Sequence, residues 1–260
     1  MAGADDPVAK ENLRKILASP SYIRAQDDLA FLARPEQRGV RLLLELNKAD
    51  TVLREENIRS TIVVFGSTRL GPDSPYYREA RELGRLVSST FQAGGFRDFV
   101  ISTGGGPGVM EAANRGAYEV GAKSVGFNIV LPQEQVPNPW ITPELCFQFH
   151  YFGIRKMHLM LRARALVAFP GGFGTLDELF EALTLVQTRK MPRVPIVLVG
   201  RDYWEKLVNW KLLVEEGMIS PEDFNLIAWA ETGAEAWKEI VDFYGRAGAP
   251  PVPDRGWQGR

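Results

Sequence analysis

A glycine-rich segment followed by a threonine and two carboxylates is the part of this sequence best suited to chemistry. It reads Phe169-Pro-Gly-Gly-Phe-Gly-Thr-Leu-Asp-Glu178. A glycine turn that opens a helix presents unpaired backbone N–H groups and the positive end of the helix dipole, which together favour a phosphate group. Thr175 can cap such a helix or donate its hydroxyl to a phosphate oxygen, and Asp177 and Glu178 add carboxylates in the first turn. The alternative is a tight turn without function, in which the acids only suit the start of a helix.

The patterns on either side of this turn predict the elements that position it. The apolar run from Ala165 to Phe169 predicts a short buried strand. Four apolar residues after the turn fall at i, i+3, i+4 and i+7, which predicts one face of a helix: Leu176, Leu179, Phe180 and Leu183. The element is therefore predicted to be a strand, a glycine turn and a helix N-terminus.

Two other glycine turns follow predicted strands in the same way. The run Thr61–Phe65 ends at Gly66-Ser67, and the run 98–102 is broken by Thr103-Gly-Gly-Gly-Pro-Gly108. Further strands are predicted over 124–130, 145–151 and 194–199, and helices over 76–92, 109–118, 153–164, 203–216 and 233–244, whereas 219–229 is ambiguous. Strands and helices that alternate at this spacing predict a Rossmann-like α/β fold, a doubly wound parallel sheet with helices on both faces.

In such a sheet the strand-to-helix loops share one edge, and ligands bind there. We therefore expect the three glycine turns and the start of the 153–164 helix to meet at one rim. The residues expected there are Gly66, Ser67, Gly104, Gly105, Gly106, Arg155, Lys156, Gly171, Gly172, Gly174 and Thr175. Three glycine turns with an Arg-Lys pair predict a mononucleotide site. Surface charges on a helix are the alternative reading of the pair.

Three segments of different character divide the chain. Residues 1–59 carry little glycine and are predicted to form an N-terminal helical extension packed on the core, with an amphipathic helix over 37–59. Residues 60–246 form the predicted nucleotide-binding catalytic domain. Residues 247–260 contain three prolines and three glycines without apolar periodicity, and we expect a flexible tail.

The composition is that of an ordinary globular protein and argues against several classes of partner. The net charge of −1 gives no basic field for nucleic acid or for an anionic membrane. No apolar run approaches the roughly 20 residues that span a bilayer, and the N-terminus is acidic where a signal peptide would be basic. The single cysteine, Cys146, lies in an apolar run, and we expect a structural role for it. A cytoplasmic protein without a metal site is predicted.

The common nucleotide and acyl-transfer motifs do not fit. A dinucleotide fingerprint needs glycines at i, i+2 and i+5, and the run from Gly104 fails this test by one position. The segment Gly121-Ala-Lys-Ser124 is close to a Walker loop, but it precedes a predicted strand instead of following one. Gly66-Ser67-Thr68 is not a nucleophile elbow.

The motifs do resemble those of the LOG (LONELY GUY) family. Pro170-Gly-Gly-Phe-Gly-Thr-Leu-Asp-Glu178 is similar to the family motif Pro-Gly-Gly-x-Gly-Thr-x-x-Glu, and the resemblance extends to Phe65-Gly-Ser67, Thr103–Glu111 and Arg155-Lys156. It covers about residues 61 to 200 and looks most like the longer bacterial branch. Members of the family are phosphoribohydrolases that release a free base from nucleoside 5′-monophosphates, including cytokinin precursors, and they have often been labelled lysine decarboxylases.

The resemblance implies a role for each matching residue. Arg155 and Glu178 take the catalytic positions, the loop from Gly171 to Thr175 holds the 5′-phosphate, and Lys156 is expected to bind substrate. Glu111 either contacts the ligand or only suits a helix start, and His158 is expected to be packed or at the surface. No metal or organic cofactor is expected, and the family implies a homodimer or a larger homo-oligomer.

The function predicted from these observations is hydrolysis of AMP, or of an N6-modified AMP, to a free base and ribose 5-phosphate. An enzyme that acts on purine nucleotides generally fits the sequence equally well. The rival prediction is a non-catalytic nucleotide- or cofactor-binding protein, such as a sensor or carrier, on the same scaffold. Binding a phosphate would not by itself need Glu178, and this favours the enzyme.

Overall fold

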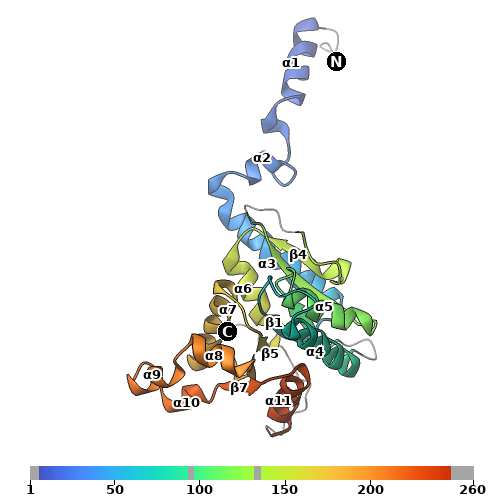
Figure 1. Ribbon diagram of the computed structural model, residues 1–260. Helices are drawn as coiled ribbons and strands as arrows, with labels where there is room; N and C mark the ends of the chain where they lie inside the picture. The colour runs from blue at the N-terminus through green and yellow to red at the C-terminus, as the bar shows by residue number, and fades with distance from the viewer. Residues whose placement is uncertain (1–5, 93–96, 132–135, 247–260) are drawn as a thin grey trace. The chain divides into compact units, whose positions relative to one another are not determined.

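A computed structural model of the 260-residue chain describes residues 6–92, 97–131 and 136–246. The chain divides into two compact units, one up to residue 47 and the other from residue 48 onward (Figure 1). The sequence prediction places the corresponding boundary after residue 59, and the packing of the N-terminal extension on the core stays a prediction. The predicted flexible tail, 247–260, lies outside the described residues.

The N-terminal unit consists of short helices with local caps. They are α1 (Pro7–Leu17), η1 (Pro20–Tyr22), α2 (Leu29–Leu32), η2 (Pro35–Gln37) and the first part of α3 (Arg38–Glu55). The side chain of Asp6 accepts a hydrogen bond from Val8 N at 2.9 Å, and Asp28 accepts one from Phe31 N at 2.9 Å. These carboxylates satisfy N–H groups that have no partner inside the helix. No residue of the first four of these helices is buried.

The second unit is built on a seven-stranded parallel sheet with the order β4-β3-β2-β1-β5-β6-β7. The strands are β1 (Thr61–Phe65), β2 (Val100–Thr103), β3 (Ser124–Ile129), β4 (Cys146–Phe149), β5 (Ala163–Ala168), β6 (Ile196–Val199) and β7 (Ile227–Ala230). The central strands β1, β2 and β5 are buried along their whole length, as expected for a sheet covered on both faces. The predicted doubly wound fold is confirmed.

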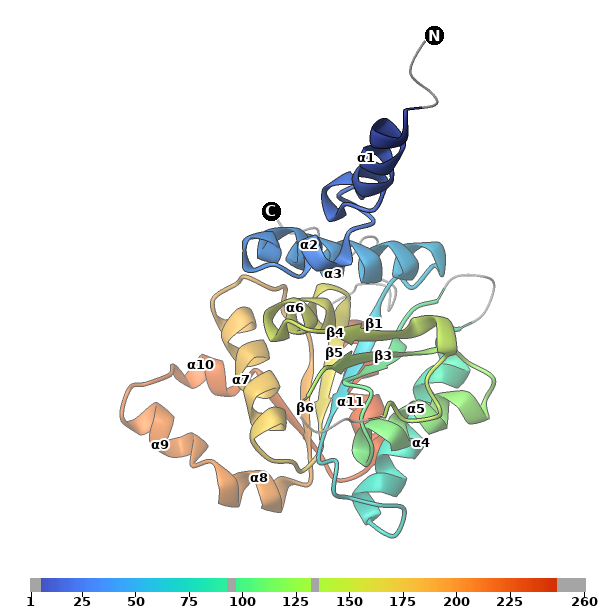
Figure 2. The same ribbon diagram turned by 90° about the horizontal axis from the view of Figure 1, so that it is seen from above.

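Helices cover both faces of this sheet (Figure 2). One face carries α4 (Pro75–Phe91), α5 (Val109–Glu119) and α11 (Gly233–Arg246), whose buried side chains form one hydrophobic cluster. The other carries the end of α3 with α6 (Phe152–Leu161), α7 (Phe173–Gln187), α8 (Arg201–Leu207) and α9 (Trp210–Glu215), which contribute to a second cluster. The two remaining short helices are η3 (Pro143–Leu145) and α10 (Pro221–Phe224). Within the described ranges no helix has both the length and the apolar character needed to cross a bilayer.

The sheet reverses its winding direction between β1 and β5. From β1 the chain adds β2, β3 and β4 outward on one side, and it then returns to place β5 against the other side of β1. The loops that leave β1 and β5 therefore diverge from neighbouring strand ends. A crevice at such a switch point is where open parallel sheets bind ligands. The first and third glycine turns of the sequence follow these two strands.

Apart from small shifts at the ends of other elements, three segments differ from the sequence prediction. The helix predicted over 153–164 ends at Leu161, because Ala163 already pairs with Thr61 in the sheet. The helix predicted over 203–216 is interrupted, because the side chain of Asn209 accepts a hydrogen bond from Leu212 N and starts α9 anew. The ambiguous segment 219–229 contains α10 and most of β7.

Candidate active site

The three glycine turns are joined to one another by backbone hydrogen bonds. Ser67 N, in the turn after β1, donates to Pro170 O at 3.0 Å in the turn after β5. Val109 N, at the end of the turn after β2, donates to Ser67 O at 3.1 Å. The three loops therefore form one connected rim, as the topology predicts.

Two glycines in this rim are required by the protein itself. Gly108 has a φ of +72°, and a Cβ atom there would lie 2.3 Å from Ser67 O. A Cβ atom at Gly171 would lie 2.1 Å from Thr175 Oγ1 and 3.0 Å from Ser67 N. Another residue at position 108 would push the first two turns apart, and one at position 171 would displace the side chain of Thr175.

Two further glycines are not required by the protein. A Cβ atom at Gly172 or Gly174 would meet no protein atom within 4 Å, and neither residue has a positive φ. Both residues line the cavity described below. The bare backbone there leaves room for a ligand to approach the N-terminus of α7 closely.

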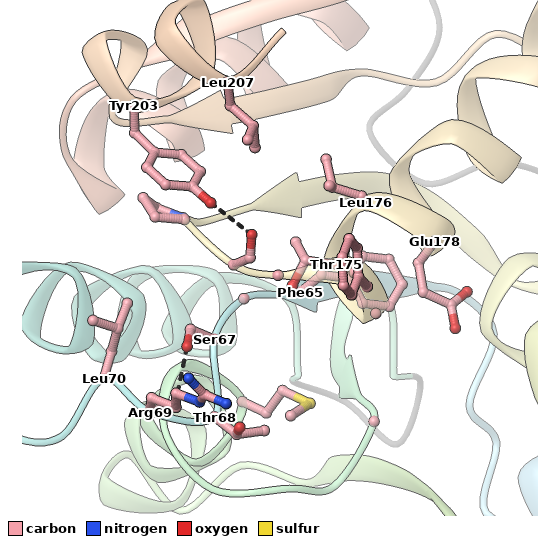
Figure 3. Close-up of a pocket in the computed structure, with 18 of the residues that line it drawn as sticks. Phe65, Ser67, Thr68, Arg69, Leu70, Thr175, Leu176, Glu178, Tyr203 and Leu207 are labelled. Atoms are coloured by element: carbon pink, nitrogen blue, oxygen red, sulfur yellow. Dashed lines mark hydrogen bonds between the residues drawn. The ribbon is translucent and has the colours of Figure 1, made fainter.

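The rim encloses a cavity of about 700 Å³, drawn in Figure 3. Ligand sites for small molecules fall in the range of roughly 300–1,000 Å³, so a mononucleotide can be accommodated. Nine of the predicted site residues line this cavity: Gly66, Ser67, Gly104, Arg155, Gly171, Gly172, Gly174, Thr175 and Glu178. The structure thus brings together residues that lie up to 112 positions apart in the sequence, from residue 66 to residue 178.

Arg155 and Glu178 form a buried ion pair in the wall of this cavity. Arg155 Nη2 donates to Glu178 Oε1 at 3.1 Å, and the Glu178 side chain is 3% exposed. The second carboxylate oxygen, Oε2, has no hydrogen-bond partner among the described residues. Arg155 also lies over the ring of Phe152, with 5.5 Å between its Cζ atom and the ring centroid.

Burial raises the pKa of Glu178 to about 7, although the charges of Arg155 and Lys156 act to lower it. Removal from water disfavours the charged form of a carboxyl group, and here this effect exceeds the attraction of the neighbouring cations. A carboxyl group in a cleft with a pKa near neutrality is a typical feature of a catalytic site.

Four predicted site residues do not line the cavity. Gly105 N donates to Thr103 Oγ1 at 3.0 Å, and Gly106 O accepts a hydrogen bond from Asn138 Nδ2 at 3.1 Å. Both glycines therefore belong to a buried polar network that supports the second turn. The other two residues, Glu111 and Lys156, are held by side chains outside the cavity.

Glu111 accepts a hydrogen bond from Tyr77 OH at 3.0 Å, within the first turn of α5. Lys156 Nζ lies 2.8 Å from Asp177 Oδ1 and 3.2 Å from Glu181 Oε2, so it joins α6 to α7. A direct contact of either residue with substrate stays a prediction.

The start of α7 differs from the sequence expectation. Gly172 occupies the N-cap position and the helix begins at Phe173, so Thr175 is not the cap. Thr175 lies in the first turn instead, where its buried side chain packs beneath Gly171. The helix therefore begins two residues before Thr175.

Several cavity residues have no counterpart among the sequence predictions. Three of them directly follow the predicted Gly66-Ser67 pair, and this position was the sequence signal that could have found them: Thr68, Arg69 and Leu70. Tyr203 and Leu207 come from α8, after β6, and no sequence signal marks them. Tyr203 OH donates to Gly171 O at 2.7 Å and so fixes the third turn from the far side (Figure 3).

His158 and Cys146 lie outside the cavity lining. His158 is buried against the rings of Phe127 and Phe149, with centroid separations of 5.8 and 5.4 Å. It is packed, as predicted. Cys146 is half-buried on β4, and burial raises the pKa of its thiol, which makes it a poor nucleophile.

The fold and the site define an α/β protein with a glycine-lined ligand cavity at the switch point of a parallel sheet. The family described as "Possible lysine decarboxylase" matches residues 110–240. Curated relatives carry the name cytokinin riboside 5′-monophosphate phosphoribohydrolase, and two of them serve as examples. LOG3 of Arabidopsis thaliana is 29% identical over 188 residues, which is 70% of this chain and 82% of the relative. The probable enzyme LOGL5 of Oryza sativa subsp. japonica is 29% identical over 198 residues, 74% of each chain.

The chain belongs to this family, the LOG family, as the motifs predict. A solved structure titled as the molybdenum cofactor binding protein from the phototrophic bacterium Rippkaea orientalis superposes with a TM-score of 0.50 at 21% identity. The superposition covers 72% of this chain and 98% of that one. At this identity the likeness concerns the fold alone.

Proposed function

We propose that this protein hydrolyses the N-glycosidic bond of a nucleoside 5′-monophosphate and releases a free base and ribose 5-phosphate. AMP or an N6-modified AMP is the proposed substrate. The proposal is supported by the curated relatives, which are named phosphoribohydrolases of cytokinin riboside 5′-monophosphates. The observation that carries it is the buried Arg155–Glu178 pair in the wall of the glycine-lined cavity.

The chemistry of this bond explains why a carboxylate is needed. Breaking the bond between C1′ and the base nitrogen builds positive charge on the ribose and negative charge on the departing base. A carboxylate beside the ribose stabilises the positive charge or orients the attacking water, as carboxylates do in glycosidases. Glu178 lies one turn into α7, so a phosphate at the N-terminus of this helix leaves its carboxylate free for the ribose.

Arg155 has a supporting role in this proposal. Its guanidinium stays protonated, so it cannot act as a general acid. The hydrogen bond from Nη2 holds Glu178 Oε1 in place, and Oε2 is then available to a ribose hydroxyl or to water. The water adds to C1′ as the base leaves, and the base is released with a proton.

A non-catalytic binding protein is the competing function, because a protein of the same fold is titled a cofactor binding protein. The buried carboxylate favours the enzyme over a carrier. A carboxylate in the wall of an anion site repels phosphate, so a protein that only binds a phosphorylated ligand gains nothing from Glu178.

Base release decides between the two functions. AMP, GMP, CMP and isopentenyl-AMP are each incubated with the wild-type protein and with Glu178→Ala, and free base is measured by chromatography. We expect release by the wild type and a loss of at least 100-fold in Glu178→Ala. Nucleotide binding without release by the wild type would contradict the enzyme. The preferred substrate shows whether the enzyme acts on N6-modified AMP or on purine nucleotides in general.

The proposed reaction uses water and no cofactor. A homo-oligomeric assembly and a cytoplasmic location also stay predictions. Gel filtration with light scattering tests the first, and fractionation of the source cells tests the second.

A further inference from the structure

The charges in the cavity wall leave one cation without a counter-charge. Of the described residues that line the cavity, three are charged: Arg69, Arg155 and Glu178. Arg155 and Glu178 offset each other at 3.1 Å. Arg69 is therefore the source of net positive charge in the lining.

Arg69 is held in the loop by its backbone, while its side chain is exposed. Its N–H donates to Ser67 Oγ at 3.1 Å, which fixes the turn after β1. Among the described residues its guanidinium has no hydrogen-bond or ion-pair partner. Exposed arginines elsewhere in the protein do have such partners, for example Arg85 with Glu82 at 2.7 Å. The Arg69 side chain can therefore bind a ligand without breaking an existing ion pair.

The loop that carries Arg69 adjoins the glycine turn expected to hold phosphate. Ser67 N donates to Pro170 O, and a Cβ atom at Gly171 would lie 3.0 Å from Ser67 N. Figure 3 draws Arg69 beside Ser67 and Thr68, on the side of the cavity away from Glu178. An anion between the two turns would face Arg69, and its uncharged remainder would extend toward Arg155 and Glu178.

We propose that Arg69 binds the phosphate group of the ligand and so makes the site select phosphomonoesters over unphosphorylated nucleosides. The choice of ligand rests on the proposed function. A phosphate monoester carries close to two negative charges near neutral pH. The N-terminus of α7 supplies only about half an elementary charge, and in the Arg155–Glu178 pair the ionised carboxylate offsets the guanidinium. A guanidinium forms strong, often bidentate, hydrogen bonds to phosphate and supplies the missing charge.

The test measures binding by calorimetry with ribose 5-phosphate, a ligand that has the phosphate but neither a base nor a bond to hydrolyse. The variants are Arg69→Gln, Arg69→Lys and the control Arg85→Gln, which removes the same charge from the exposed surface of α4. We expect Arg69→Gln to weaken ribose 5-phosphate about 10- to 100-fold, the usual range for a hydrogen bond to a charged group. Arg69→Lys should lose less, and Arg85→Gln should bind as the wild type does.

Adenosine provides the specificity arm, because it has the base and ribose without phosphate. Its affinity should change less than two-fold in Arg69→Gln, while the thermal midpoints of both glutamine variants stay at the wild-type value. An equal loss for adenosine would place Arg69 at the base or ribose and overturn the proposal. Unchanged binding of ribose 5-phosphate in Arg69→Gln, or its failure to bind the wild type, would overturn it as well.

The outcomes separate this proposal from the proposed function. Ribose 5-phosphate binding that depends on Arg69, in a wild-type protein that releases no base from any nucleotide, would contradict the hydrolase and leave the phosphate site intact. The opposite result is base release by the wild type together with an Arg69→Gln variant whose ribose 5-phosphate binding and KM for AMP are unchanged. It would support the hydrolase and overturn the role of Arg69.

Discussion

At Glu178, burial and neighbouring cations act in opposite directions on one carboxyl group. Burial dominates and raises its pKa to about 7. Ionising the buried Glu178 carboxyl group costs folding stability, but the proposed reaction uses the ionised form. Loss of stability at a functional site is a common compromise in proteins. Two predictions follow from this residue, one for activity and one for stability.

The first concerns activity as a function of pH. If the ionised carboxylate stabilises positive charge on the ribose, kcat/KM for AMP should rise as pH increases through about 7, because kcat/KM reports the free enzyme. The phosphate ionises near pH 6, so ribose 5-phosphate binding measured over the same pH range serves as the control. A profile that falls through pH 7 would instead make protonated Glu178 a general acid.

The second concerns stability. A carboxyl group whose pKa is raised on folding has no effect on stability below its unfolded value of 4.5, and it destabilises the fold progressively as pH rises toward 7. Glu178→Gln removes this penalty, which can reach ~3 kcal/mol at one pKa unit per 1.36 kcal/mol.

Thermal unfolding of wild type and Glu178→Gln checks this expectation. The variant should melt several degrees above the wild type at pH 8 and close to it at pH 4.5. A variant that is less stable than the wild type at pH 8 would show that the attraction of Arg155 outweighs the burial of the charge.

At the scale of elements, the glycine turn before α7 combines two kinds of glycine. Gly171 is held by contacts within the protein, whereas Gly174 faces the cavity and no protein atom. The turn is also fixed from outside, by Ser67 N on Pro170 O and by Tyr203 OH on Gly171 O. Substitutions at Gly171 and at Gly174 should therefore change the free energy of unfolding in opposite directions.

Gly174→Ala should stabilise the fold, because it adds a better helix former to the first turn of α7 without a clash, by about 0.5–1 kcal/mol. The same methyl group should weaken phosphate binding by blocking the approach to the helix. Gly171→Ala should destabilise the fold through its contact with Thr175. Chemical denaturation and ribose 5-phosphate titration of both variants measure these effects. Unchanged ligand binding in Gly174→Ala would place the phosphate elsewhere.

At the scale of the molecule, the end of α3 packs as part of the sheet unit. Ala49 and Leu53 are buried in its hydrophobic core, and Asp50 Oδ1 lies 2.6 Å from Arg162 Nη2. Ile58 is also buried and forms a bridge with Arg97. The first four helices of the chain have no buried residue. The sheet unit therefore needs residues before position 60.

Two truncations test this boundary. The fragment 38–260 keeps α3 and should unfold within about 1 kcal/mol of the full chain, because none of the helices that it lacks contains a buried residue. The fragment 60–260 loses Leu53 and the partner of Arg162, and it should lose about 2–5 kcal/mol, the usual range for emptying core space. Denaturant midpoints give both values. A large loss in fragment 38–260 would instead support packing of the N-terminal helices on the core.

The sequence by itself determined the alternation of strands and helices and the three glycine turns. These follow from local signals, because apolar periodicity and glycine after a strand depend on neighbouring residues only. Arg155 and Glu178 were singled out by the resemblance to the LOG family, and their ion pair is seen only in the structure. The parallel topology then implied that the turns would meet, and nine of the predicted residues line one cavity.

Only the tertiary structure decided which side chains pair across elements. Lys156 stands next to Arg155 in the sequence, yet it contacts Asp177 and Glu181 outside the cavity lining. Tyr203 enters the site from a helix that no motif marks. The pKa of Glu178 likewise depends on burial by elements far away in the chain. Such contacts depend on the sheet order and on how each helix is rotated about its axis, and these are set by packing of the whole domain.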